Sequence, residues 1–310
     1  MGLNRTSATE FVLLGFPLSQ RIQVLLFGLF SLLYALTLLG NGAILGIISL
    51  NPQLHTPMYF FLCHLAAVDM AYACNTVPQM LVNLLRPARP ISFAGCMAQT
   101  FLFLTFAHTE CLLLVVMSYD RYVAICRPLR YSAVVSRKVC ITLVGTSWVL
   151  GVLLALVHLG LLLPLRFCGP WKINHFFCEI TAVLKLACAD THINELLVLA
   201  GAVSVLVGPF SSIVVSYIHI LHAVLKIQSG EGRQKAFSTC SSHLCVVGLF
   251  YGSAITMYVG PRYGNSREQK KYLLLFHSLF NPMLNPLIYS LRNKEVKAAL
   301  KRIFGKERTA

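Results

Sequence analysis

The chain has 310 residues, of which 56% are apolar and only 12% are charged. The charged share is about half of the roughly 25% that is usual in a soluble domain, which argues against a cytosolic enzyme. The net charge of +15 could suggest nucleic acid as a partner. However, the basic residues lie between long apolar runs and not on one polar face. A membrane protein with basic loops is therefore the better interpretation.

Seven apolar runs are long enough to cross a lipid bilayer as helices, which takes about 20 residues each. In chain order they span 24–50, 57–84, 97–119, 140–163, 196–225, 236–259 and 271–291. Each run far exceeds the roughly 10 residues of a membrane barrel strand. The predicted fold is an all-α bundle of seven transmembrane helices. The chain then divides into an N-terminal segment 1–23, a helical domain 24–291 with a long loop at about 164–195, and a tail 292–310.

The distribution of charge predicts how the bundle is oriented. On the side of the C-terminus the loops and tail carry 15 Lys and Arg with four acids, whereas the other side carries 11 with five acids. Because cytoplasmic loops are enriched in Lys and Arg, we expect a cytoplasmic C-terminus and an outside N-terminus. Asn4-Arg5-Thr6 is an N-glycosylation sequon at the outer end, which agrees with this orientation. The apolar segment 11–16 is too short for a cleavable signal peptide, so the first membrane helix is expected to direct insertion.

The 11 cysteines are an odd number, so not all of them can pair within the chain. Four lie on the outer side, where disulfides persist: Cys96, Cys168, Cys178 and Cys188. Four cysteines allow three pairings, and their spacing does not choose between them. A zinc site is the alternative, but no C-x-x-C is present and the nearby His175 and His192 lack zinc-finger spacing.

Five short motifs occur in order at defined places in the predicted helices. They are Gly40-Asn41 in the first helix, LHTPMYFFL (54–62) at the start of the second, MSYDRYVAIC (117–126) at the end of the third, KAFSTC (235–240) at the start of the sixth and PMLNPLIY (282–289) at the end of the seventh. With these motifs the chain resembles the rhodopsin-like G-protein-coupled receptors, and specifically the tetrapod odorant (olfactory) receptors. The resemblance extends from Gly15 to Asn293. The sixth helix has Phe250-Tyr251-Gly252 in place of the Trp-x-Pro of the wider superfamily, which is typical of odorant receptors.

The resemblance implies a plasma-membrane receptor and not an enzyme. A small odorant would bind from outside and activate a heterotrimeric G protein of the stimulatory, olfactory type, which raises cAMP. The implied ligand-binding residues lie in the outer half of the bundle: Phe103, Leu104, Ala107, His108, Gly201, Val205, Tyr251, Ala254, Tyr258, Leu275 and Ser278. This mostly apolar set suits a hydrophobic volatile with one oxygen-bearing group. No Asp occupies the third-helix position that amine receptors use, which disfavours cationic amines.

The resemblance also assigns the residues that couple to the G protein. They are Asp120, Arg121, Tyr122, Tyr217, Asn285, Pro286 and Tyr289. Arg121 would be held by Asp120 at rest and released toward the G protein, with Tyr217 and Tyr289 moving inward to support it. The alternative is an ordinary interfacial arginine whose charge is offset by a neighbouring acid. The resemblance further pairs Cys96 with Cys178 and Cys168 with Cys188, and Pro209, Pro282 and Pro286 are plausible helix pivots.

Asp69 and Glu110 are the two acids at membrane depth. Two close carboxylates there require a cation or a shared proton. The resemblance places them beside Asn285, Asn281 and Asn41, in the polar cluster where the family would hold a sodium ion. A protonated, hydrogen-bonded core without an ion is the alternative, and no other cofactor is expected.

Two rival functions remain at this stage. An ion-coupled transporter or channel would use Asp69 and Glu110 as its ion path, although an odd number of helices without an internal repeat argues against most transporter folds. A membrane enzyme is disfavoured because HExxH, GxSxG and P-loop motifs are absent from the sequence.

Overall fold

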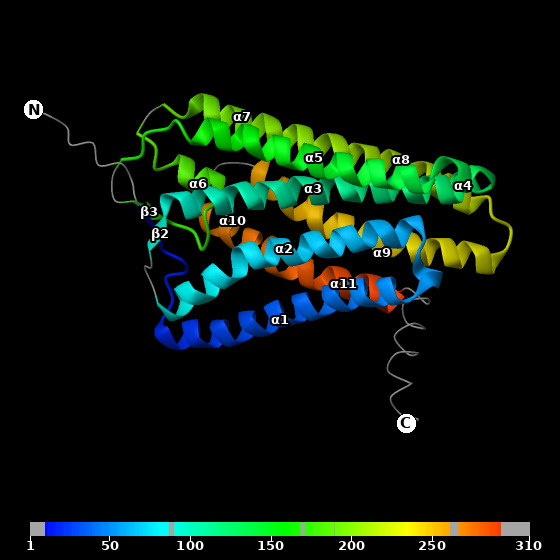
Figure 1. Ribbon diagram of the computed structural model, residues 1–310, viewed down its shortest axis with the longest axis horizontal. Helices are drawn as coiled ribbons and strands as arrows, with labels where there is room; N and C mark the ends of the chain where they lie inside the picture. The colour runs from blue at the N-terminus through cyan, green and yellow to red at the C-terminus, as the bar shows by residue number, and fades with distance from the viewer. Residues whose placement is uncertain (1–9, 87–89, 169–170, 189, 261–265, 293–310) are drawn as a thin grey trace, which may run out of the picture.

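The computed structural model describes residues 10–86, 90–168, 171–188, 190–260 and 266–292. Their long helices run alongside one another in a single bundle (Figure 1). Six helical stretches are long and apolar enough to cross a membrane. They are α1 (Gln20–Leu50), α2 (Pro57–Leu85), α3 (Phe93–Cys126), α5 (Arg137–Leu162), the stretch of α7 (His192–Ala202) and α8 (Gly208–Leu225), and α9 (Gly230–Tyr258). The seventh predicted crossing is α10 (Ser266–Leu275) followed by α11 (Asn281–Arg292).

Two of the crossings contain a π-helical turn. Val203–Val207 joins α7 to α8, and Phe276–Phe280 joins α10 to α11. Each turn directly precedes a helix with a proline in its first two positions, Pro209 in α8 and Pro282 in α11. A π turn takes in one more residue than an α turn, so it rotates the face that the following residues present. These two turns therefore decide which side chains reach the interior.

The starts of the long helices follow the capping rules of isolated helices. The hydroxyl oxygens of Ser92, Ser136 and Ser229 accept hydrogen bonds from backbone N–H groups in the first turns of α3, α5 and α9. Pro57 begins α2, where the missing N–H costs nothing. On the loop after α3 lie two short helical turns, Pro128–Arg130 and α4 (Tyr131–Val134), and Pro52–Leu54 forms another between α1 and α2.

Helix α3 lies at the centre and packs most closely against α5 at Gly151. A Cβ at that position would lie 2.3 Å from the Thr109 hydroxyl oxygen and 3.0 Å from the Thr105 carbonyl oxygen. Only glycine permits this approach of the two backbones. By contrast, α1 keeps a large apolar face outside the bundle, with Leu25 and Leu39 about 70% exposed (72% and 70%). A soluble protein could not present such a face, whereas lipid covers it without cost.

Three short strands cap one end of the bundle, opposite the end that carries α4 (Figure 1). β1 (Glu10–Leu13) pairs antiparallel with β2 (Pro90–Ser92) and parallel with β3 (Lys172–Ile173). The apolar segment 11–16, which is too short for a signal peptide, contributes Phe11 and Leu13 to this cap, and both side chains are fully buried.

Two disulfides fix the long loop to the cap. Cys96 at the start of α3 is bonded to Cys178, and Cys168 is bonded to Cys188 within the loop. These are the pairings that the resemblance implied. The loop also contains the short helix α6 (Ile180–Leu184), which begins directly after the first disulfide.

Candidate functional site

A mostly apolar cavity lies among α3, α5, the α7–α8 stretch and α9, with α6 of the long loop beside it. Its lining residues are Phe103, Leu104, Ala107, His108, Cys111, His158, Ile180, Val198, Ala202, Val205, Leu206, Phe250, Ala254, Tyr258 and His277. Disulfide Cys96–Cys178 positions Ile180 at the cavity because α6 follows it directly. A cavity with apolar walls and a few polar groups is the usual form of a small-molecule site.

Seven of the eleven residues predicted to bind ligand line this cavity, and four do not. Those that line it are Phe103, Leu104, Ala107, His108, Val205, Ala254 and Tyr258. Gly201 lies behind His158, because a Cβ there would be 3.0 Å from the His158 Nε2 atom. Leu275 and Ser278 flank His277, which lines the cavity in their place from within the π turn. Tyr251 is fully buried against α3 and does not line the cavity.

The cavity residues that sequence reasoning missed follow a recognisable spacing on α3. Leu104, Ala107, His108 and Cys111 are separated by three or four residues, so Cys111 extends a face that was already identified. His158 on α5 gave no such signal. Its Nδ1 atom lies 2.8 Å from the Leu154 carbonyl oxygen, to which it donates, and its ring centroid is 5.7 Å from that of His108.

Two polar groups at the cavity have no hydrogen-bond partner within the described part of the chain. They are the Tyr258 hydroxyl and the Nδ1 atom of His108, both buried. An unpaired buried polar group is costly, and a ligand with a complementary group removes that cost. These two atoms are therefore the polar contacts that this cavity offers to a bound molecule.

Helix α9 connects the cavity wall to α3. The Tyr251 hydroxyl donates to the Cys111 carbonyl oxygen at 2.9 Å, and Cys111 itself lines the cavity. The neighbouring Phe250 also lines the cavity and packs 4.9 Å from the His277 ring. The Phe250-Tyr251-Gly252 segment is thus the place where α9, α3 and the cavity meet.

Farther inward, the two membrane-depth acids share one asparagine neighbour. The Asn285 side chain donates to both carboxylate oxygens of Asp69, at 2.9 and 3.2 Å. Glu110 is 3% exposed, and its Oε1 atom has no hydrogen-bond partner among the residues that the structure describes. Two buried carboxylates with an unpaired oxygen are compatible with either alternative from the sequence, a bound cation or a shared proton, and do not choose between them.

The other two asparagines that were expected at this cluster point elsewhere. Asn281 Nδ2 lies 3.3 Å from His277 Nδ1 and 3.5 Å from the Ser253 hydroxyl. Asn41 Nδ2 donates to the carbonyl oxygens of Thr37 and Pro282. Asn41 therefore joins α1 to α11, and Asn281 joins α11 to α9.

The end of α3 opposite the strand cap holds the predicted arginine close to its acid. Arg121 Nη2 lies 3.9 Å from Asp120 Oδ2, and the Tyr131 hydroxyl donates to Asp120 Oδ1 at 2.7 Å. Burial, and then the hydrogen bond to Asp120, raise the pKa of Tyr131 well above its usual value, so Tyr131 stays a neutral donor. Tyr122 packs against His219, with ring centroids 6.0 Å apart, and against Arg127.

A histidine that the sequence analysis did not single out connects three helices in the inner half. His243 on α9 lies 2.8 Å from the Tyr217 hydroxyl on α8 and 3.1 Å from the Leu114 carbonyl oxygen on α3. Because a carbonyl only accepts, Nε2 donates to Leu114, and in a neutral imidazole Nδ1 then accepts from the Tyr217 hydroxyl. Tyr217 is therefore bonded to α9, while the hydroxyl of Tyr289 is buried without a described partner.

Asn4 lies outside the described residues. Within those residues, no group of three or more His, Cys, Asp and Glu side chains is arranged to hold a metal ion. Pro286 is inside α11, directly after Asn285. Pro78 lies inside α2, an interruption that sequence analysis did not weigh.

The chain is similar to known proteins in both sequence and fold. A family model described as olfactory receptor matches residues 30–307. The chain is 78% identical to human olfactory receptor 2A25 over all of both chains, and 77% identical to mouse olfactory receptor 2A7 over 99% of each. The structure is similar to the crystal structure of squid rhodopsin, with a TM-score of 0.72 and 18% identity over 94% of this chain and 88% of that one.

Proposed function

Because the chain belongs to the olfactory receptor family, we propose that its odorant-occupied state activates a heterotrimeric G protein of the stimulatory, olfactory type and raises cAMP. Odorant binding, G-protein coupling and a multi-pass membrane location follow from the family itself. The proposal adds the type of G protein, the site of the ligand and the route between them.

The observation that supports the proposal is that α9 makes hydrogen bonds to neighbouring helices at two levels along its length. Tyr251 holds α9 to the Cys111 carbonyl oxygen beside the outer cavity, and His243 holds it to Leu114 and Tyr217 nearer the cytoplasm. A rigid helix with one attachment at the ligand and another near the G protein transmits a change of packing. A ligand shifts this equilibrium only by its difference in affinity for the two packings. The contacts at Phe250 and Tyr258 supply such a difference, because both residues are on α9.

At the cytoplasmic end, release of α9 would free Tyr217 from His243 and open the surface around Arg121. Arg121 carries a permanent charge with five N–H donors in a planar fork. Such a fork suits the exposed carbonyl oxygens at a helix C-terminus, where the helix dipole is negative. We assign the contact with the G protein to this residue, with Tyr122, Tyr217 and Tyr289 around it.

For the ligand, the lining favours a small, neutral, largely apolar molecule with one oxygen-bearing group. Most of the wall is aliphatic or aromatic, and the two unpaired polar atoms belong to His108 and Tyr258. Carboxylate and ammonium groups of the described residues are absent from the wall, which disfavours cationic odorants.

The proposed orientation, with the N-terminus outside, rests on the charge asymmetry of the loops and on the sequon at Asn4. The glycan would sit on the same side as the disulfide-bonded cap. Endoglycosidase should therefore shift the electrophoretic band of the receptor, and Asn4→Gln should remove that shift. Staining of a tag after Ala310 on intact, unpermeabilised cells would reverse the orientation.

A sodium ion at Asp69 and Glu110 is a further part of the proposal. The oxygen ligands for this ion would be the unpaired Glu110 oxygen and the two Asp69 oxygens, which accept hydrogen bonds from Asn285. Asn281 would have to turn away from His277 to join them. Asp69→Asn should then abolish any sodium dependence of odorant-evoked cAMP at unchanged surface level. Equal sodium dependence in the variant and the wild type would favour the shared proton.

The experiment for the G-protein type uses cells that lack the stimulatory and olfactory α-subunits. An odorant panel is screened for cAMP in cells that express the receptor, and the active odorants are tested again after each α-subunit is restored separately. The proposal expects no cAMP response without these subunits and a restored response with either of them. A current evoked by odorant in a membrane patch free of G protein would instead favour the channel alternative.

A further inference from the structure

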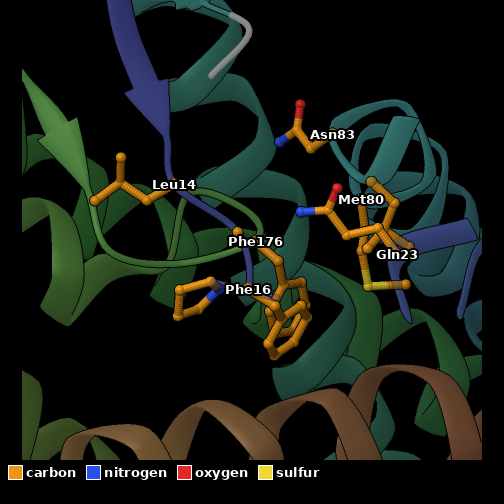
Figure 2. Close-up of a pocket in the computed structure, with 9 residues that line it drawn as sticks. Leu14, Phe16, Gln23, Met80, Asn83 and Phe176 are labelled. Atoms are coloured by element: carbon orange, nitrogen blue, oxygen red, sulfur yellow. The ribbon is translucent and has the colours of Figure 1, made fainter. Parts of the chain in front are cut away.

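A second cavity lies at the outer end of the bundle, between the segment that follows β1 and the outer ends of α1 and α2. It shares no lining residue with the odorant cavity described above. Leu14 and Phe16 line it from the N-terminal segment, Gln23 from α1, Met80 and Asn83 from α2, and Phe176 from the long loop. Figure 2 shows Leu14 and Phe16 across the cavity from Gln23 and Met80. None of the functions assigned so far uses this cavity.

Asn83 brings an unsatisfied hydrogen-bond donor to this cavity. The residue is 7% exposed, and its Oδ1 atom accepts from the Gln79 amide at 3.2 Å. Its Nδ2 atom is buried and has no hydrogen-bond partner in the described part of the chain. In Figure 2 the amide nitrogen is turned toward the interior of the cavity. Since buried donors are nearly always paired, an acceptor from outside the chain is the expected partner.

Apart from the Gln23 amide, the other side chains of the wall are apolar, and the aromatic ones are firmly held. Phe16 stacks on Phe176 with ring centroids 5.5 Å apart and on Tyr272 at 5.8 Å. The backbone next to it is fixed as well, because Lys271 donates to the carbonyl oxygen of Gly15. Gly15 has a φ of +60°, a conformation that glycine adopts without strain. The cavity is therefore built into the fold and does not depend on a loose side chain.

We propose that this cavity is a second ligand site, separate from the odorant cavity, for a small neutral molecule with a short apolar body and one hydrogen-bond acceptor, such as a ketone, aldehyde or ester. The acceptor takes the Asn83 Nδ2–H, and Gln23 is the second amide within the wall. The apolar body contacts Met80 and the edges of the stacked phenylalanines. A carboxylate ligand is disfavoured because Lys271 does not line the cavity and the ammonium already donates to Gly15 and Asn174.

The test uses photolabelling of the purified full-length receptor, which requires no G protein. The reagent is an eight-carbon methyl ketone with a diazirine on its chain, and the control reagent is the same hydrocarbon diazirine without the carbonyl group. The labelled peptides are identified by mass spectrometry. We expect the ketone to label the peptides that contain Leu14–Gln23 and Met80–Leu84 more strongly than the hydrocarbon does.

Replacing the donor should remove that preference. Asn83→Leu keeps the size of the side chain and removes the amide, so labelling at these peptides should fall about fivefold, the effect of one lost hydrogen bond, while labelling near Cys111 in the odorant cavity is unchanged. Equal labelling by ketone and hydrocarbon in the wild type, or equal ketone labelling in wild type and variant, would overturn the proposal. Equal labelling of that kind would mean that the cavity holds only water or lipid chains.

A second variant covers the case in which Asn83→Leu does not reach a folded state. Leu14 is 43% exposed at the mouth of the cavity, so Leu14→Trp fills the space with little risk to the fold. The matched control is Leu163→Trp, at a leucine that is 47% exposed and lines neither cavity. The proposal requires Leu14→Trp to block ketone labelling and Leu163→Trp to leave it intact. Persistent labelling in Leu14→Trp contradicts it.

Discussion

Lys271 is the residue that ties the N-terminal segment to the helix bundle. Its ammonium donates to the Gly15 carbonyl oxygen and to Asn174 Oδ1, and it lies 5.0 Å from the centroid of the Phe16 ring. Burial, and then this nearby cation, lower the pKa of His175 to about 3. His175 is therefore neutral in the folded cap at any pH near neutrality.

The lowered pKa predicts how the stability of the cap depends on pH. In the unfolded chain His175 has its ordinary pKa near 6.5, so its contribution to stability is complete above that pH and is lost as the pH falls toward 3. At pH 5 the loss from His175 is about 2 kcal/mol. Thermal unfolding of the purified receptor at pH 7 and pH 5 should show a smaller difference in His175→Phe than in the wild type. An equal difference would show that His175 is charged in the cap.

Tyr258 provides a test of the odorant cavity at the scale of one atom. Its hydroxyl is buried beside the cavity and close to the Glu179 carboxylate. Tyr258→Phe should reduce the potency of oxygen-bearing odorants about fivefold, which is the effect expected for the loss of one hydrogen bond. Their maximal cAMP response should be unchanged. Tyr272→Phe, at an exposed ring outside both cavities, is the control. Unchanged potency for every active odorant would remove Tyr258 from the ligand site.

At the scale of elements, the contact of α3 with α5 depends on one glycine. Gly151→Ala would place a Cβ 2.3 Å from the Thr109 hydroxyl and 3.0 Å from a backbone oxygen, so the helices must separate. We expect a destabilisation of about 1–3 kcal/mol, as for other overpacked sites. The control is Gly145→Ala on the same helix, where a Cβ meets nothing within 4 Å. Thermal unfolding in detergent should distinguish the two variants, and equal melting temperatures would contradict the close approach.

The elements also show where sequence reasoning succeeds and where it stops. On α3 the four residues that the resemblance implied, Phe103, Leu104, Ala107 and His108, all line the cavity, because an uninterrupted helix keeps its phase. In the seventh crossing the resemblance implied Leu275 and Ser278, whereas His277 lines the cavity. The π turn at Phe276–Phe280 changes the phase there, and composition carries no signal for such a turn.

Contacts between segments that are distant in the chain could not be predicted from the sequence either. The bond from His243 to Tyr217 and the turn of Asn281 toward His277 depend on the relative rotation of three helices. The pairing of β1 with β2 and β3 joins segments that are short and far apart in the chain. By contrast, the helix spans followed from hydropathy and the family from the motifs at the helix ends. The disulfide pairs came only through the resemblance to that family, because the cysteine spacing alone left three pairings open.

At the scale of the whole molecule, the bundle combines the proposed ligand cavity, toward the capped end, with an arginine held by Asp120 at the opposite end. Helix α9 connects them, through Tyr251 at the cavity and His243 farther inward. Asp69 and Glu110 lie between, where a change in the packing of α2, α3 and α11 would alter the space that the two carboxylates share. Ligand binding at the cavity can change the structure around Arg121 only if this helix packing has two states that bind the ligand with different affinity.

The most direct test of this mechanism is the cAMP response of Arg121→Ala, compared with the wild type at equal surface density. Arg121 is at the end of α3 opposite the strand cap and lines neither cavity, so its removal should leave membrane delivery and odorant binding intact. We predict the loss of odorant-evoked cAMP in Arg121→Ala, and only partial recovery in Arg121→Lys, which keeps the charge but not the planar fork. A normal cAMP response in Arg121→Ala would contradict the proposed coupling.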